Sequence, residues 1–179
     1  MIETICGECK VSLFYAPVSH GNGRTRREGE LRTERALLDE AFGAGVELGH
    51  DAYGAPFVKG FAGSVSLSHC EGLCVLAVCR SNDVGVDVER WREQLRRIAP
   101  RFLLPTEMVR CGSEPDNLLK CWTAKEAVFK AAGVPGLAIG EIAVDLQQSE
   151  ALLKSGRKFN VKFLGEFPLI TAVAIEKPE

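Results

Sequence analysis

Long hydrophobic runs, internal repeats and low-complexity segments are all missing from this chain of 179 residues. No stretch approaches the ~18 consecutive apolar residues that a membrane-spanning helix needs, so the sequence excludes a membrane span. Residues 1–4 are not a basic segment leading into an apolar run, so we expect no signal peptide. Without a flexible linker or a repeat, we expect the chain to fold as one compact unit.

A large excess of charge is missing as well. The chain has 22 basic and 24 acidic side chains and a formal net charge of −2, which argues against nucleic-acid binding through bulk charge. With 46% hydrophobic and 26% charged residues, the composition is that of an ordinary globular protein. The length suits one sizeable domain or two small lobes that share a core.

The seven cysteines lack the pattern of a disulfide framework or a zinc site. Their odd number, mostly inside apolar segments, favours free thiols in a reducing, cytoplasmic compartment. Cys6 and Cys9 form a Cys-x-x-Cys pair, but no second pair follows, and His20 and His50 do not have zinc-finger spacing. We therefore interpret Cys6 and Cys9 as incidental thiols at a frayed or strand-edge terminus.

The periodicity of apolar residues predicts alternating strands and helices. We expect strands at 10–16, 64–67, 73–79, 84–89, 140–146, 158–164 and 169–176. We expect helices at 24–42, 91–102 and 118–132. Gly43 and Gly133 are placed to end the first and third helices, and Pro100 interrupts the second.

Two acidic side chains lie close together in the predicted strand Gly85-Val86-Asp87-Val88-Glu89. Side chains in a strand repeat every two residues, so Asp87 and Glu89 project from one face. Carboxylates this close repel each other unless a cation lies between them. Magnesium is the usual cation where phosphates are nearby, because it prefers oxygen ligands. A solvated strand face is the alternative.

A third carboxylate lies in the predicted helix Trp122-Thr123-Ala124-Lys125-Glu126-Ala127-Val128-Phe129-Lys130. Trp122, Glu126 and Lys130 are spaced at i, i+4 and i+8, so they form one stripe. Together with the strand they make a plausible site for a metal and a phosphate. Taken alone, Glu126 and Lys130 would be a surface salt bridge worth about 0.3–0.5 kcal/mol. We expect Trp122 to pack the helix and to orient Glu126.

In combination these motifs resemble the signature of the 4′-phosphopantetheinyl transferases, which is Gly-x-Asp-x-Glu followed by Trp-x-x-Lys-Glu-x-x-x-Lys. Upstream, Ser66-Leu67-Ser68-His69 is similar to the Ser-His motif of that family. Ile98-Ala99-Pro100-Arg101-Phe102, followed by Glu107, is similar to its Arg-Phe…Glu segment. The resemblance covers roughly residues 50–146, in the expected order and at the expected spacings.

The resemblance implies an α+β fold of two lobes related by a pseudo-twofold axis. Each lobe would be a small, mainly antiparallel sheet packed on a long helix, at residues 1–84 and 85–179. Coenzyme A would bind in the cleft between the lobes, near Asp87 and Glu89. We expect a compact monomer.

The resemblance also implies a reaction and a set of roles. The 4′-phosphopantetheine group of coenzyme A would pass to a serine of an apo acyl or peptidyl carrier protein, and 3′,5′-ADP would leave. Asp87, Glu89 and Glu126 would hold magnesium, Glu126 would act as general base, and Lys130 would contact phosphate. The expected coenzyme contacts are Ser68, His69, Lys125, Lys130, Arg24 and Arg27.

Two features leave alternatives open. Ala55 stands where many relatives have a lysine, so Arg24 and Arg27 are expected to supply the missing charge for the 3′-phosphate. Arg92 and Arg96 share a helix face and could dock an acidic carrier, or they could be a solvated face.

Two other functions also fit: a magnesium-dependent pyrophosphate hydrolase that uses water on a small nucleotide, and a catalytically silent module that binds coenzyme A or a carrier.

Overall fold

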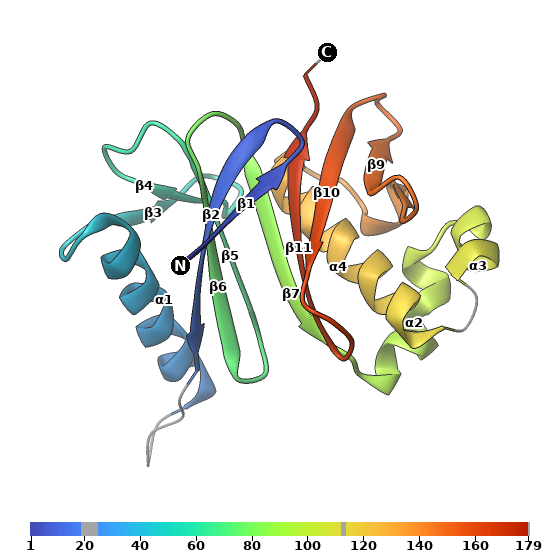
Figure 1. Ribbon diagram of the computed structural model, residues 1–179, viewed down its shortest axis with the longest axis horizontal. Coiled ribbons are helices and arrows are strands. Elements are labelled where there is room, and N and C mark those ends of the chain that lie inside the picture. Colours follow the sequence, from blue (N-terminus) through green and yellow to red (C-terminus); the bar gives the residue numbers. More distant parts are fainter. Residues whose placement is uncertain (19–24, 112–113, 179) are drawn as a thin grey trace.

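The computed structural model describes residues 1–18, 25–111 and 114–178, which form two antiparallel sheets flanked by helices (Figure 1). The first sheet has the order β1-β2-β6-β5. Its strands are β1 (Ile2–Cys6), β2 (Cys9–Pro17), β5 (Ser64–Cys70) and β6 (Leu73–Cys79). Helix α1 (Arg26–Phe42) packs on one face of this sheet, and a small hairpin of β3 (Leu48–His50) and β4 (Pro56–Val58) follows it.

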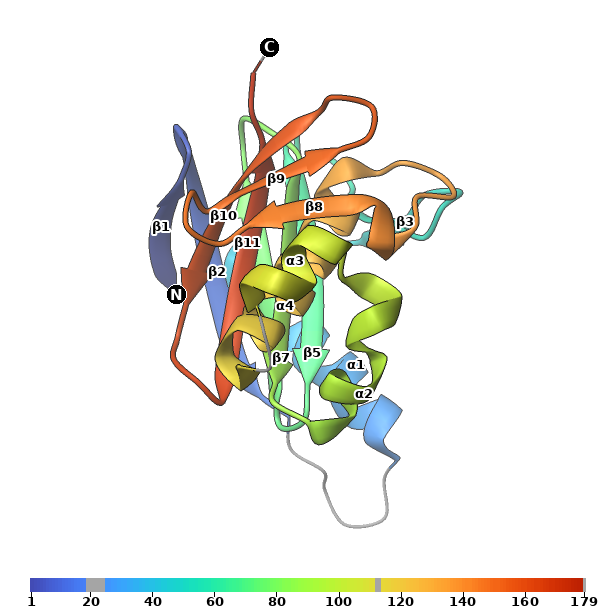
Figure 2. The ribbon, with the colours of Figure 1, turned by 90° about the vertical axis from the view of Figure 1, so that its right-hand side faces the viewer.

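The second sheet has the order β7-β11-β10-β9-β8. Its strands are β7 (Val84–Arg90), β8 (Ile142–Asp145), β9 (Glu150–Leu153), β10 (Lys158–Leu164) and β11 (Leu169–Glu176). Helix α4 (Pro115–Ala132) packs on β7 and β11. The helices α2 (Glu93–Phe102) and α3 (Pro105–Cys111) contact α4 from its outer side, and the 3₁₀ turn η1 (Ile139–Glu141) precedes β8 (Figure 2).

Most of the expected elements are present, and the α+β class is confirmed. Strands β1, β3, β4 and β9 and helix α3 were not predicted, and the expected strand at 140–146 is the shorter β8. Helix α4 begins at Pro115, because proline is tolerated in the first turn of a helix. Cys6 and Cys9 lie at the ends of a β1–β2 hairpin, with Cys6 buried. No helix in the described residues is long and apolar enough to cross a membrane.

Local sequence explains where the two long helices begin and end. Thr25 caps α1 through a capping box with Glu28, which satisfies free backbone N–H groups of the first turn. Gly43 follows the last residue of α1, as expected. Gly133 ends α4 in the left-handed conformation, where a side chain would be strained.

Strand β7 separates two chemically different surfaces. Val84, Val86 and Val88 are buried in the apolar core between the two sheets. The alternate positions face α4, and Gly85 is the closest approach: a Cβ atom there would lie 1.9 Å from the carbonyl oxygen of Ala127. Only glycine lets α4 pack this close, and the close packing brings the helix within reach of the carboxylates of β7.

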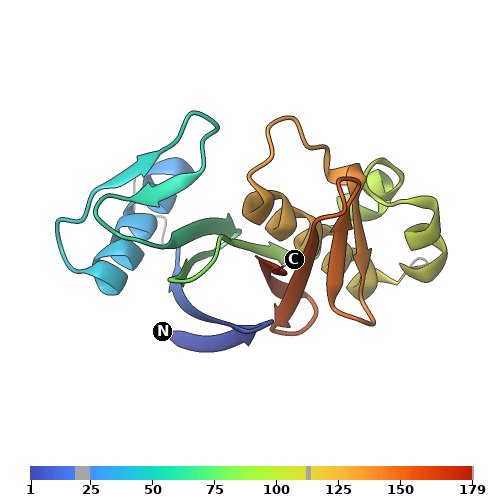
Figure 3. The same cartoon turned by 90° about the horizontal axis from the view of Figure 1, so that it is seen from above.

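The two sheets meet along β5 and β7, and Figure 3 shows the two halves of the molecule side by side. The Oγ atoms of Ser64, Ser66 and Ser68 accept hydrogen bonds from the backbone N–H groups of Val84, Val86 and Val88, at 3.1, 3.0 and 3.2 Å. We call this row the serine ladder. Matching residues advance together along both strands, so β5 and β7 run parallel. All strands of the first sheet precede residue 80 and all strands of the second follow residue 83, but the division into lobes at 84/85 and their twofold relation stay predictions.

Candidate active site between strand β7 and helix α4

Asp87 is the centre of the candidate site. It is only 5% exposed, and its Oδ1 atom accepts hydrogen bonds from the Ser68 hydroxyl at 2.7 Å and from Lys130 Nζ at 2.9 Å. Lys130 Nζ also donates to the carbonyl oxygen of Val86, at 2.9 Å. The second oxygen, Asp87 Oδ2, is buried and has no hydrogen-bond partner among the described residues. A buried carboxylate oxygen without a partner is costly, so it marks a place for a cation or a donor.

Glu89, two residues further along β7, is held from two sides. The indole Nε1–H of Trp122 donates to Glu89 Oε1 at 3.0 Å. Arg92 Nη2 donates to both carboxylate oxygens, at 3.2 and 3.0 Å. Burial, reinforced by the negative charge of Asp87, raises the pKa of Glu89 despite the hydrogen bond from Trp122.

Glu126 lies on α4 between Trp122 and Lys130. Burial and the charges of Asp87 and Glu89 raise its pKa to about 7, although Lys130 partly offsets them. Its carboxylate forms no hydrogen bond with any other residue in the described ranges. A carboxylate that titrates near neutral pH can accept and return a proton under ordinary conditions.

These residues suit a magnesium ion. Burial and neighbouring negative charge raise the pKa values of Glu89 and Glu126, and Asp87 Oδ2 lacks a partner among the described residues. Oxygen atoms of this kind are the ligands that magnesium prefers. Within residues 1–18, 25–111 and 114–178, no three acidic, histidine or cysteine side chains already converge as a metal cage. Arg92 and Lys130 instead neutralise Glu89 and Asp87.

Trp122 only partly matches its expected role. It packs on Phe102, with the ring centroids 5.0 Å apart, as a core residue should. Its polar group, however, contacts Glu89 and not Glu126. Trp122 therefore orients Glu89 on the neighbouring strand β7.

Two of the expected coenzyme contacts, Lys125 and Ser68, are buried and already bind other groups of the protein. Lys125 is 0% exposed, and its Nζ atom forms an ion pair with Glu107 Oε2 at 2.7 Å and bonds to the carbonyl oxygen of Ile142. Its ammonium group is enclosed among α4, α3 and the start of β8, so it is not available to a bound phosphate in this structure. Ser68 is also buried, and its hydroxyl donates to Asp87, so in this structure it positions that carboxylate.

His69 lies on the other face of β5, toward α1. Its Nε2 atom is 3.3 Å from Glu30 Oε2, and Nδ1 is 4.0 Å from Glu34 Oε1. Arg27 is exposed and lies 3.8 Å from each of the same two carboxylates. Burial acts to raise the pKa of Glu30, but Arg26, His69 and Arg27 more than offset it, so that pKa is lowered. The coenzyme contacts of His69 and Arg27 stay predictions.

Arg24 lies outside the described residues. Arg92 and Arg96, the expected carrier contacts, are both exposed at the start of α2. Arg96 Nε is 2.8 Å from Glu93 Oε1, and its guanidinium carbon lies 5.8 Å from the centre of a Trp91 ring. The docking role of these arginines stays a prediction.

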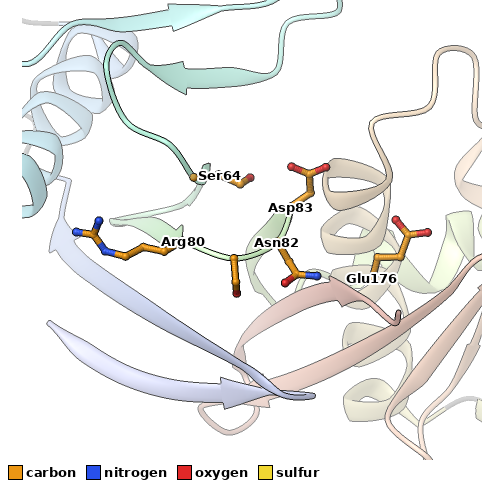
Figure 4. Close-up of a pocket in the computed structure, with 7 residues that line it drawn as sticks. Ser64, Arg80, Asn82, Asp83 and Glu176 are labelled. Atoms are coloured by element: carbon orange, nitrogen blue, oxygen red, sulfur yellow. The ribbon is translucent and has the colours of Figure 1, made fainter. Parts of the chain in front are cut away.

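A separate pocket of about 460 Å³ lies where β5 and β7 begin, at the far end of the serine ladder from Asp87 (Figure 4). It is lined by Gly63, Ser64, Arg80, Ser81, Asn82, Asp83 and Glu176. Both carboxylate oxygens of Glu176 are bonded to Arg157 at 2.6 Å, and the Arg80 side chain extends away from Asp83 (Figure 4). The lining of this pocket does not include Asp87, Glu89 or Glu126, so the pocket is separate from the candidate site.

Sequence reasoning missed several residues that build the site. Glu107 was matched only as part of a motif, yet it binds Lys125 and the backbone N–H groups of Leu104 and Val144. Gly85 and Ser66 were quoted without a structural role. The alternation of serine in Ser64-Val65-Ser66-Leu67-Ser68 was the available signal for a polar row on one face of β5.

Comparisons with known proteins show which family this chain resembles. The family profile of the 4′-phosphopantetheinyl transferase superfamily matches residues 83–177, which is more than half of the chain. The chain is 33% identical over 155 residues to the 4′-phosphopantetheinyl transferase HetI of Nostoc sp. (strain PCC 7120), covering 79% of this chain and 64% of that protein.

Two further relatives are more distant. Identity to a 4′-phosphopantetheinyl transferase of Bacillus subtilis is 28% over 108 residues, covering 55% of this chain and 48% of the relative. Identity to the 4′-phosphopantetheinyl transferase gsp of Aneurinibacillus migulanus is 30% over 112 residues, covering 59% and 46%. The chain thus spans between 46% and 64% of the lengths of these relatives.

Proposed function

The chain belongs to the 4′-phosphopantetheinyl transferase superfamily, and we propose that it transfers the 4′-phosphopantetheine group of coenzyme A to a serine of an apo carrier protein. The observation that carries the proposal is that Asp87, Glu89, Glu126 and Lys130 are neighbours between β7 and α4: Lys130 binds Asp87, and burial and the charges of neighbouring carboxylates raise the pKa values of Glu89 and Glu126. A serine oxygen attacks the phosphorus attached to pantetheine, the bond from that phosphorus to the bridging oxygen breaks, and 3′,5′-ADP leaves.

Each side chain has a distinct part in this scheme. Asp87, Glu89 and Glu126 would hold magnesium, which when bound neutralises the charge of the pyrophosphate oxygens. Ser68 and Lys130 orient Asp87 so that Oδ2 stays available. Lys130 is 28% exposed on its side chain, so its remaining N–H capacity can meet a phosphate oxygen.

Glu126 is the proposed general base. It is the one of the three carboxylates that is free of hydrogen bonds from other described side chains and backbone groups, and its pKa of about 7 matches the proton affinity that a base needs near neutral pH. It takes the proton of the attacking hydroxyl.

The setting and the oligomeric state belong to the same proposal. All seven cysteines are free thiols, which supports a reducing, cytoplasmic compartment. We expect a monomer, because one chain supplies both sheets.

The test is incubation of the protein with coenzyme A, magnesium and a panel of apo carrier proteins, followed by intact-mass analysis of each carrier. We expect one carrier to gain the mass of one phosphopantetheine, and we expect an excess of chelator or the change Asp87→Asn to abolish the gain. Asp87→Asn keeps the size of the side chain, so circular dichroism should show an intact fold. Release of 3′,5′-ADP without any carrier would instead favour the hydrolase.

A further inference from the structure

Glu89 and Arg92 form the contact that a metal ion would have to disturb. We propose that Arg92 is a built-in counter-ion of Glu89, which a divalent cation displaces, so that metal binding releases the Arg92 guanidinium toward the surface where the partner docks. This inference rests on the proposed function for the role of the three carboxylates, and it adds a link between metal binding and the docking surface.

The geometry shows that Arg92 covers both oxygens of Glu89. A single nitrogen, Nη2, lies 3.2 Å from Oε1 and 3.0 Å from Oε2. A guanidinium in this position satisfies the same charge that a cation would satisfy. A divalent cation held by Asp87, Glu89 and Glu126 would add two positive charges beside it, and like charges this close repel each other strongly in a partly buried site.

Of the two positively charged side chains at the site, Arg92 is the one that can leave. Its side chain is 58% exposed, whereas that of Lys130 is 28% exposed. Lys130 is also anchored by the carbonyl oxygen of Val86. Arg92 has no such second anchor among the described residues, and its side chain makes no capping hydrogen bond to α2.

Glu89 stays in place when Arg92 leaves. Its side chain is only 16% exposed, and Trp122 holds Oε1 from α4. The exchange therefore needs only a rotation of the long, solvated Arg92 side chain, while the carboxylate keeps its orientation. Once released, Arg92 lies one helical turn from Arg96, next to Trp91. Arg92 would thus couple metal binding at Glu89 to the charge of this surface.

A supporting role for Arg92 makes the opposite prediction. If Arg92 oriented Glu89 for the metal, its removal would weaken metal binding. If Arg92 competes with the metal, its removal strengthens binding. The sign of the change therefore separates the two.

The experiment is a calorimetric titration of Mn²⁺ into the purified full chain, without coenzyme A or carrier, at low and high potassium chloride. The variants are Arg92→Gln, Arg92→Lys and the control Arg97→Gln, which removes one charge from an exposed position of the same helix. We expect Arg92→Gln to bind Mn²⁺ about two- to five-fold more tightly at low salt, with a smaller gain at high salt. The Mn²⁺ affinities of Arg92→Lys and Arg97→Gln should stay near that of the unsubstituted protein.

A second readout follows the release directly. Phenylglyoxal modifies accessible arginines, and peptide mass spectrometry reports each site. Mn²⁺ should increase the modification of Arg92 and leave that of Arg97 unchanged. Weaker or unchanged Mn²⁺ binding by Arg92→Gln, no Mn²⁺ binding by any of the proteins, or no increase in Arg92 modification would each overturn the inference. Carrier modification by the unsubstituted protein separates the two failures. If the protein modifies a carrier but gives any of these results, only the inference fails. If the protein modifies no carrier, the proposed function fails.

Discussion

Lys125 Nζ lies 2.7 Å from Glu107 Oε2, and the two side chains are 0% and 4% exposed. The other oxygen of Glu107 accepts from the backbone N–H of Val144, and Oε2 also accepts from that of Leu104. One buried ion pair therefore ties α4 to the start of α3 and to β8. The lysine next to the proposed base supports the helix on which that base is placed.

Removal of this lysine should destabilise the fold. We expect Lys125→Met to lower the free energy of unfolding by about 3–5 kcal/mol, because Glu107 would keep a buried charge without its partner. Urea unfolding measures the change. Lys120→Met is the matched control, because Lys120 pairs with Asp116 near the surface of the same helix and should cost at most about 1 kcal/mol. A small loss for both variants would contradict the buried pair. Lys125→Met combined with Glu107→Gln should recover part of the stability, because glutamine removes the buried charge and its carbonyl oxygen can still accept a backbone N–H.

Glu126→Gln should separate chemistry from binding. Glutamine keeps the shape but cannot accept the proton, so we expect kcat to fall by at least about 100-fold while the KM for coenzyme A changes little. Lys130→Ala should alter both constants, because a phosphate contact exists before and during the reaction. Steady-state kinetics with a modified carrier as product reports both. Equal, small losses would show that neither side chain takes part in the reaction.

The pH dependence of stability should also reveal Glu126. Its pKa rises from 4.5 to about 7 on folding, so the folded state binds the proton more tightly. The stabilisation from this proton is complete below pH 4.5 and is lost as the pH rises through 7. Without metal, we expect the original chain to lose about 1–2 kcal/mol more than Glu126→Gln between about pH 5 and pH 8.

Chemical denaturation of both proteins at each pH, in chelator, measures that difference. Added magnesium should stabilise the original chain most at the higher pH, where the carboxylates are ionised. Parallel curves for the two proteins would show that Glu126 has an ordinary pKa.

Carrier docking should depend on the charge at the start of α2. Arg92 contacts Glu89, so its reversal would disturb the metal site as well; Arg96→Glu is the cleaner probe. We expect it to raise the KM for an acidic carrier by about two- to ten-fold at low salt, with the KM for coenzyme A unchanged. Lys154→Glu, an exposed reversal on the far hairpin, is the control. Carrier kinetics that are the same for both variants would leave α2 as a solvated face.

Local periodicity predicted much of this site. The two-residue repeat of β7 places Asp87 and Glu89 toward α4, and the helical repeat brings Trp122 and Lys130 to the same strand. The same reasoning should have excluded Lys125, because neighbouring helix residues point about 100° apart. It lies among Ala124 and Val128, which are fully buried.

Other contacts could not be predicted from local patterns. The bond from Ser68 to Asp87 depends on the register between edges of two separate sheets, which no turn or short spacing determines. The contact between Arg92 and Glu89 depends on how the chain leaves β7 and enters α2. Both are tertiary choices that side-chain periodicity does not encode.

The serine ladder couples the junction of the two sheets to the candidate site. In a continuous sheet, carbonyl oxygens would hold the N–H groups of β7, and almost any side chain could stand opposite them. Here the seam depends on three hydroxyl groups, and the last of them, Ser68, also holds Asp87. A movement that opens the seam at this end must therefore loosen the carboxylate at the same time. Through the hydroxyl of Ser68, the position of Asp87 therefore depends on the separation of the two sheets.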